Sequence, residues 1–461
     1  MEAVKTINFI ISIVFIVCYT YQFVYILVPF VVKDKRKGEA VSHRYAVLVS
    51  ARNEEAVIGN LIESIKRQTY DGGLVTTFVV ADNCTDDTAR VAADAGAIVF
   101  ERFDTANVGK GYALNYLLHR IDEIFPERPF DGYFVFDADN VLEENYIEEM
   151  NKVFSQGYGI VTSYRNSKNF GDNWISSGYA LWFLRESQFL NHARFNLGTS
   201  CAVSGTGFLF SQKVLDDCGG WHFHLLTEDI EFTVHSVVRG LKIGYCHDAI
   251  LYDEQPTGFR QSWRQRLRWA RGYLQVFGKY GKDLLRGIAH GSFSCFDMTM
   301  NIMPAAILSF IGVFANGIAA VYGLVAGQDI SVIGESLLSM LLNTYLTLLI
   351  IGGSATISEW KRIYAPNWKK VVYTFTFPLF MFTYIPISFA ALFARRVTWK
   401  PIVHTRSASR HTRCGRDADR PHRLSAALFP PSPRPTMGGA FFCARAAKKP
   451  SGLSRTAFVV A

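Results

Sequence analysis

The stretch Tyr133-Phe-Val-Phe-Asp137-Ala-Asp139 joins a short apolar run to two carboxylates. Similar apolar runs alternate with segments of helical period from about residue 45 to residue 277, a pattern typical of a parallel α/β sheet. The runs predict strands at 45–49, 77–81, 97–101 and 133–136. Because ligands bind at the carboxyl ends of strands in open parallel sheets, Asp137 and Asp139 are predicted to face a ligand.

Asp137 and Asp139 are candidate metal ligands, and Asp137 is also a candidate substrate contact. Two carboxylates at a strand end can share one divalent cation, and Mg²⁺ or Mn²⁺ prefers such oxygen ligands together with waters and substrate phosphates. The metal would neutralise the charge that grows on a departing diphosphate. A D-x-D motif is common by chance, so this prediction depends on the motifs downstream.

Three further residues lie where they can contact the same ligand. Asp82 follows the second predicted strand, although an ordinary loop carboxylate is an alternative. Glu54 lies in the turn after the first strand, where acidic residues also suit a helix N-terminus. Lys110 stands between two glycines and begins a predicted helix, a combination that suits phosphate. The full spacing of a Walker loop is missing.

The motif Thr227-Glu228-Asp229 contains the candidate general base. An isolated Asp at a helix entry is more often a cap. As a base, Asp229 would take the proton of an attacking acceptor hydroxyl, and Glu228 could do so in principle. General-base help of this kind contributes typically about 10²–10⁴ in rate.

Gln265, Arg268 and Trp269 lie in a segment rich in arginine and share one face at helical spacing. A charged helix face usually meets water or lipid headgroups. Here Arg268 can grip a diphosphate in fork geometry, and Trp269 offers a flat platform for a sugar ring.

Two loops leave their interpretation open. Gly205 and Thr206 belong to a Gly-Thr-Gly turn that would let an acceptor approach the backbone, and a plain turn is equally consistent. His222 and His224 could suggest a metal pair, but the sequence offers no third ligand, so packing in an aromatic-rich loop is favoured.

Composition excludes a nucleic-acid function. The formal net charge is +8, and residues 401–461 alone hold nine Arg, two Lys and two Asp, so the remaining chain has no basic excess. The eight cysteines are scattered singly, which fits reduced thiols in a cytoplasmic domain better than a disulfide frame or a zinc site.

Hydrophobic segments predict a membrane protein. Residues 7–32 are long enough to cross a bilayer, and the basic cluster at 33–37 places the next domain in the cytoplasm. Further spans are predicted at about 302–325, 333–357 and 371–393. With the N-terminus outside, four spans would put the C-terminus outside as well. The positive charges of Arg395 and Arg396 favour the cytoplasmic side instead, and the sequence does not resolve this conflict.

The predicted organisation has five parts. Residues 1–38 form an anchor, 39–276 a catalytic domain, 277–300 an interfacial amphipathic helix, 301–396 the C-terminal transmembrane helices, and 397–461 a tail. An ordinary amphipathic helix on the soluble domain is the alternative for 277–300. The tail is rich in Arg, Pro and Ser, which predicts disorder, and a reading-frame error in the gene is a further hypothesis for it.

The motifs, in this order, resemble the family 2 glycosyltransferases of GT-A fold over about residues 40–280. The stretch around Asp82 resembles that family's uridine-binding loop, so the resemblance implies that Asp82 contacts the base or ribose. It also implies that Asp139 is the direct metal ligand and Asp229 the catalytic base. Gln265, Arg268 and Trp269 match the QxxRW motif of processive cellulose, chitin, hyaluronan and poly-N-acetylglucosamine synthases. The sequence around the motifs is most similar to that of bacterial exopolysaccharide transferases.

The resemblance implies an inverting, metal-dependent hexosyltransferase of the plasma membrane, which adds sugars from a UDP-sugar to a growing extracellular polysaccharide through β-linkages. Its expected partners are the donor, a polysaccharide or lipid-linked acceptor, membrane lipid, and secretion or co-synthase subunits. A single addition to a lipid acceptor is the alternative. A non-catalytic scaffold is disfavoured because every acidic motif is present, and a transporter because Glu335 is the one obvious charge in the predicted spans. The sequence does not decide the sugar, the linkage or the oligomeric state.

Overall fold

The computed structural model describes residues 2–32, 39–325 and 331–394. The tail predicted at 397–461, the basic cluster at 33–37 and the pair Arg395–Arg396 lie outside these ranges. Predictions about the tail and about the orientation in the membrane therefore remain predictions.

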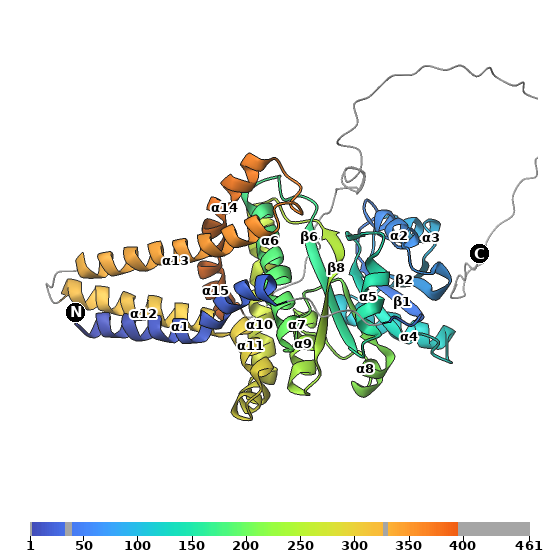
Figure 1. Cartoon of the computed structure of the whole chain (residues 1–461), viewed down its shortest axis with the longest axis horizontal. Helices are drawn as coiled ribbons and strands as arrows, with labels where there is room; N and C mark the ends of the chain where they lie inside the picture. Colours follow the sequence, from blue (N-terminus) through green and yellow to red (C-terminus); the bar gives the residue numbers. More distant parts are fainter. Residues whose placement is uncertain (1, 33–38, 326–330, 395–461) are drawn as a thin grey trace, which may run out of the picture. The chain divides into compact units, whose positions relative to one another are not determined.

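An eight-stranded sheet forms the core of the part between residues 45 and 253 (Figure 1). Its order is β3-β2-β1-β4-β7-β6-β8-β5. The strands are β1 (Tyr45–Ala51), β2 (Val75–Asp82), β3 (Ile98–Arg102), β4 (Gly132–Asp137), β5 (Val141–Leu142), β6 (Ile160–Ser167), β7 (Phe208–Ser211) and β8 (Ile243–Asp253). The four strands predicted from sequence are confirmed and pair in parallel, whereas β7 and β5 run antiparallel to their neighbours. The predicted α/β class with a mostly parallel sheet is thus confirmed.

Helices cover the sheet, which explains why its strands are continuously apolar. Val47 to Val49 of β1 and Phe134 to Phe136 of β4 are fully buried. Helix α2 buries Ile58, Leu61, Ile62 and Ile65, as its period predicts. The helices of this part are α2 (Ile58–Lys66), α3 (Thr88–Asp94), α4 (Lys110–Ile124), α5 (Tyr146–Phe154), α6 (Trp174–Arg185), α7 (His192–Leu197), α8 (Gln212–Asp217) and α9 (Glu228–Val238).

A π-helical segment, Glu186–Asn191, joins α6 to α7. Such segments are rare and occur often at functional sites, because the extra residue in the turn redirects the side chains that follow. Here the redirected turn begins with Glu186.

Helix α10 runs without interruption from Phe259 to Ala289 and is followed by α11 (Phe293–Ile302). The predicted boundary between residues 276 and 277 therefore falls inside one helix, because no proline or capping residue interrupts the segment. The arginine-rich motif and the proposed interfacial segment belong to the same element. Contact of α10 with lipid remains a prediction.

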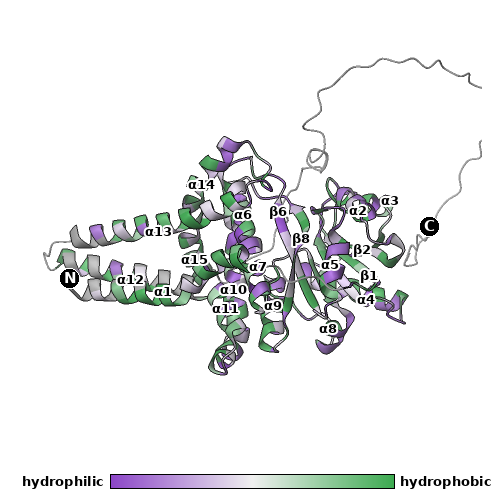
Figure 2. Cartoon of the chain, viewed as in Figure 1, coloured by the Kyte–Doolittle hydropathy of each residue, from purple (hydrophilic) through white to green (hydrophobic). Residues whose placement is uncertain are grey.

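The remaining helices are strongly apolar (Figure 2). They are α1 (Glu2–Val31), α12 (Pro304–Val325), α13 (Ser331–Ser358), α14 (Asn367–Phe382) and α15 (Tyr384–Phe393). Three segments of the described chain are long and apolar enough to cross a membrane: Phe9–Val31, Leu337–Ser358 and Asn367–Phe393. They coincide with three of the predicted spans. The span predicted at 302–325 coincides with α12, whose side chains are only partly described, and it stays a prediction.

A buried ion pair connects α1 with helices α7 and α11. Arg194 on α7 binds Asp297 on α11 through two hydrogen bonds of 2.7 and 2.8 Å, and both side chains are fully buried. The hydroxyls of Tyr21 and Tyr25 on α1 donate to the same carboxylate at 2.8 and 3.0 Å. The carboxylate thus joins three helices.

Candidate active site

One large cavity, of about 1540 Å³, gathers nearly all the residues that the sequence singles out. It lies at the carboxyl ends of β1, β2 and β4 and continues between α1, α13 and α15. The predicted residues that line it are Glu54, Asp82, Lys110, Asp137, Asp139, Gly205, Glu228, Asp229, Gln265, Arg268 and Trp269. Of the predicted set, only Thr206 does not line it.

Asp82, Lys110, Asp137 and Asp139 form what we call the strand-end cluster. The Lys110 ammonium group pairs with the Asp137 carboxylate and donates to the Gly205 carbonyl at 2.7 Å. Arg102 donates to Asp82 at 2.6 Å, and both side chains are nearly buried. Asp82, Lys110 and Asp137 are therefore each paired with an opposite charge within the protein.

The donors of the strand-end cluster fit a divalent cation. Asp137 and Asp139 both reach the cavity, and one oxygen of Asp139 accepts from the Glu254 amide at 2.8 Å, which fixes the carboxylate. In the described part of the chain, no group of three His, Cys, Asp or Glu side chains could enclose a metal by itself. Two carboxylates suit an ion that keeps waters and phosphate oxygens in its shell.

Thr206 is a buried positioning residue for the Asp137 turn. Its hydroxyl accepts from the Asp137 amide at 2.9 Å and donates to the side chain of Asn140. The neighbouring Gly207 has φ +67°, and a Cβ there would lie 1.9 Å from a methyl carbon of Leu251. The predicted role of Thr206 at the acceptor is therefore replaced by packing beneath the strand-end cluster.

Glu228 and Asp229 begin α9 and face the cavity. Burial and the neighbouring Asp229 raise the pKa of Glu228 to about 7, although Lys110 and Arg268 lower it. Burial also raises the pKa of Asp229, against the Ile230 amide and the charge of Arg268. Two adjacent carboxyls with raised pKa values are suited to accept a proton near neutral pH.

The three residues of the arginine-rich motif line the cavity from α10, as their spacing predicts. Arg268 donates to the Leu226 carbonyl at 2.7 Å and so braces the loop before α9. Trp269 meets the ring of Tyr179 edge-on at 5.7 Å between centroids. Gln265 has a buried side-chain oxygen with no hydrogen-bond partner among the described residues.

Close packing brings the Thr227-Glu228-Asp229 motif against the arginine-rich motif of α10. A Cβ at Gly272 of α10 would lie 2.5 Å from the hydroxyl oxygen of Thr227. Only glycine permits this approach, which brings α10 against the start of α9.

His224 stacks on Tyr112 with ring centroids 4.2 Å apart and an angle of 3° between the planes. His222 Nε2 donates a hydrogen bond to the Gly219 carbonyl at 2.5 Å. The two histidines thus have separate neighbours, in agreement with the loop-packing interpretation.

Several charged residues that line the cavity were not predicted from the sequence. Asp253 is the last residue of β8 and pairs with Arg165, whose Nε donates at 2.6 Å. A carboxylate after an apolar run was the available signal, the same one that reveals Asp137. Glu186 gave no such signal, because it belongs to the π-helical segment.

The family model described as "Glycosyltransferase like family 2" matches residues 43–272. This range contains the whole strand-end cluster and the motifs at 227–229 and 265–269. This chain is a family 2 glycosyltransferase. Its curated relatives include a beta-monoglucosyldiacylglycerol synthase of Nostoc sp., 27% identical over 280 residues that cover 57% of each chain. A poly-beta-1,6-N-acetyl-D-glucosamine synthase of Staphylococcus epidermidis is 24% identical over 238 residues, covering 50% of this glycosyltransferase and 54% of the relative.

The chain thus spans little more than half the length of these relatives. Among solved structures it is similar to the mannosyltransferase PcManGT from Pyrobaculum calidifontis in complex with GDP-Man and Mn²⁺. The TM-score is 0.54 at 14% identity, over 85% of this chain and 100% of the other. This likeness confirms the GT-A fold.

Proposed function

We propose that the protein transfers a sugar from a UDP-sugar, with inversion, to an acceptor hydroxyl that Asp229 deprotonates. The placement of Asp229 supports this most directly. Asp229 lines the same cavity as the strand-end cluster and Trp269. Burial raises its pKa, while the charges of Arg268 and Lys110 both act to lower it. A donor and an acceptor could therefore both reach it.

The donor would bind along the strand ends. Asp82 and Glu54 would contact the nucleoside, and Lys110 at the start of α4 would face the diphosphate, where a lysine and a helix N-terminus favour phosphate. Asp137 and Asp139 would bind Mg²⁺ or Mn²⁺, which neutralises charge on the leaving group. The similar mannosyltransferase is solved with GDP-Man and Mn²⁺.

Asp229 would act as the base. Two neighbouring buried carboxylates resist ionising together, so the pKa values of Glu228 and Asp229 are both raised and the pair has affinity for a proton. Asp229 then takes the proton of the acceptor hydroxyl while that oxygen attacks the anomeric carbon. Attack opposite the departing diphosphate gives a β-linkage from an α-linked donor.

The acceptor we favour is a growing polysaccharide, extended processively on the cytoplasmic side of the plasma membrane and passed outward, with co-synthase subunits as candidate partners. The complete QxxRW motif on the cavity wall supports this proposal. A single addition to a lipid acceptor is the second candidate. Apolar side chains of α1 and α13 line the far part of the cavity, among them Phe23 and Leu348, and the Nostoc relative is named for a lipid product.

Membranes that contain the full chain would be incubated with a panel of labelled UDP-sugars and Mg²⁺ or Mn²⁺, and the product would be sized. We expect one sugar to enter a long polymer, and Asp229→Asn to reduce turnover by about 10²–10⁴. A product with one added sugar on lipid would select the second candidate.

The matched control is Asp94→Asn, since Asp94 is 68% exposed on α3 in a surface ion pair. It should behave as wild type. Unchanged turnover in Asp229→Asn would refute the assignment of the base.

A further inference from the structure

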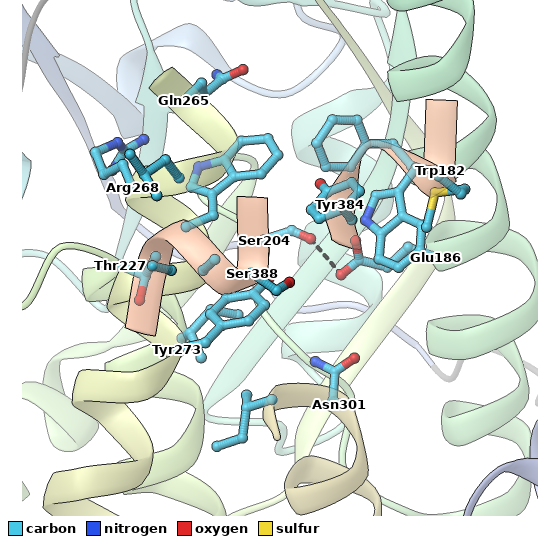
Figure 3. A pocket seen from close by; sticks show the side chains of 18 of the residues that line it. Trp182, Glu186, Ser204, Thr227, Gln265, Arg268, Tyr273, Asn301, Tyr384 and Ser388 are labelled. Atoms are coloured by element: carbon cyan, nitrogen blue, oxygen red, sulfur yellow. Dashed lines mark hydrogen bonds between the residues drawn. The ribbon is translucent and has the colours of Figure 1, made fainter. Parts of the chain in front are cut away.

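The part of the cavity beyond Asp229 has a composition that the transfer step does not explain. Here α6, α10 and α15 enclose a space that Figure 3 shows from close by. We call it the acceptor chamber and define it by Trp182, Glu186, Ser204, Tyr273, Tyr384 and Ser388.

Glu186 provides a carboxylate in this chamber. The Ser204 hydroxyl donates to one of its oxygens at 2.6 Å (Figure 3). Its other oxygen has no hydrogen-bond partner within the described residues. Burial raises the pKa of Glu186, which marks the energetic cost of keeping this group away from water. A carboxylate oxygen that lines a cavity without a hydrogen-bond partner is suited to accept a hydrogen bond from a ligand hydroxyl.

Aromatic rings line the rest of the chamber. Trp182 and Tyr384 lie 6.2 Å apart between ring centroids, with 30° between their planes. Tyr273 projects from α10 into the same space, one helical turn beyond Trp269 (Figure 3). Flat rings beside a few polar groups are typical of sites that bind ligands with both an apolar face and hydroxyls.

The chamber adjoins the reaction centre. Ser204, which binds Glu186, precedes Gly205, and a Cβ at Gly205 would lie 3.8 Å from an Asp229 carboxylate oxygen. The pKa of Tyr273 is raised by burial and then by the charges of both Glu186 and Asp229, so its ring lies near each. A ligand in the chamber could therefore extend into the site of attack.

The nearby arginines form no hydrogen bond with Glu186 among the described residues, although burial lowers the pKa of Arg185 and the charge of Glu186 acts to raise it. Arg165 pairs with Asp253, Arg194 pairs with Asp297, and Arg185 donates to Gln22 at 2.6 Å. None of these guanidinium groups donates to Glu186 in the part of the chain that the structure describes. Their charges lower its pKa, yet its hydrogen bond comes from Ser204 alone.

We propose that the acceptor chamber binds a sugar ring that the acceptor already has, and that Glu186 is a specificity-determining residue which accepts a hydrogen bond from that ring. The inference rests on the proposed transfer reaction and narrows its acceptor to a saccharide, either a free glycan end or a glycolipid headgroup. A simple lipid alcohol would leave the Glu186 oxygen without a partner.

The test compares three acceptor probes on the full-length protein in lipid nanodiscs, with the UDP-sugar that supports incorporation. The probes are n-octyl β-D-glucoside below its micelle concentration, methyl β-D-glucoside and 1-octanol. We expect octyl glucoside to exceed octanol by about tenfold or more in kcat/KM, since a lost hydrogen bond to a charged group has about that effect. If the acceptor is a free glycan end, methyl glucoside should be used as well as octyl glucoside. If the acceptor is a glycolipid headgroup, methyl glucoside should be the poorer acceptor.

Variants of Glu186 locate the effect. Glu186→Gln and Glu186→Ala should raise KM for octyl glucoside, the latter by about tenfold or more, while KM for the UDP-sugar stays within twofold. Glu127→Gln, at an exposed position, is the matched control. Equal use of octanol and octyl glucoside by wild type would overturn the proposal, as would an unchanged acceptor KM in Glu186→Ala.

A binding measurement separates this inference from the reaction itself. Trp182 and Trp269 line the cavity, so octyl glucoside should change the tryptophan fluorescence of wild type more strongly than octanol does, and less in Glu186→Ala. No incorporation from any UDP-sugar would refute the proposed function. Equal fluorescence responses to both probes would refute the chamber instead, and the wild-type comparison decides even where a variant fails to fold.

Discussion

The strand-end cluster and the acceptor chamber face the same cavity but are built differently. In the cluster, Lys110 pairs with Asp137, and Asp82 pairs with Arg102. Elsewhere in the cavity, Gln265 and Glu186 each keep an oxygen without a hydrogen-bond partner among the described residues. These cluster charges are thus paired before a ligand binds, whereas Gln265 and Glu186 leave hydrogen-bonding capacity for one.

Lys110→Met should give the largest effect that is specific to the cluster. It removes the partner of Asp137 and a cation that would face the diphosphate, so kcat/KM for the UDP-sugar should fall by about tenfold to a hundredfold. The KM for octyl glucoside should change little. Steady-state kinetics with each substrate varied checks this, with the exposed Lys66→Met as control.

Asp82→Asn should test whether the cluster contributes to stability. It leaves the Arg102 guanidinium with a weaker partner in a nearly buried site, so the free energy of unfolding should fall by about 1–3 kcal/mol. Chemical denaturation of the detergent-solubilised protein measures this. An unchanged stability would mean that the pair of Asp82 and Arg102 does not contribute to folding.

Glu228→Gln should shift the pH profile. Glu228 lies beside Asp229 and raises its proton affinity when ionised, so removing that charge should move the acid limb of kcat to lower pH by about one unit. In wild type the rate should fall as the pH drops, because Asp229, whose pKa is raised, takes up a proton and no longer acts as the base. An acid limb that stays in place would indicate that the two carboxyls titrate independently.

Gln265→Leu should give the smallest change in stability and the opposite pattern from Asp82→Asn. It removes a buried oxygen that lacks a partner, so the free energy of unfolding should change by less than about 1 kcal/mol or increase. The acceptor KM should rise a few-fold while the donor KM stays constant. A large loss of stability would show that Gln265 is structural.

The difference between the two sides also explains what the sequence predicts. Asp82, Asp137 and Asp139 follow apolar runs, and the rule that ligands bind at strand ends brings them together without knowledge of tertiary structure. Glu228, Asp229 and the motif on α10 were found through their order and their resemblance to a family. Thr206 was misplaced because the sequence does not reveal that its hydroxyl points beneath the turn.

Glu186 was not predictable by these means. Its orientation depends on one π-helical turn between α6 and α7, and hydrophobic periodicity does not distinguish such a turn from an ordinary helix. The continuity of α10 was missed for a related reason, since the functional motif at its start and the amphipathic segment at its end suggested two elements.

The buried carboxylate of Asp297 has a consequence for engineering the protein. Because Tyr21 and Tyr25 donate to it beside Arg194, helix α1, a candidate membrane span, is part of the folded interior of the protein. A foreign anchor of equal length and hydropathy would leave that carboxylate short of two donors. Helix α1 therefore contributes to the folded structure and does not serve as a membrane anchor alone. Removal of residues 1–25 would yield a defective protein rather than a soluble one.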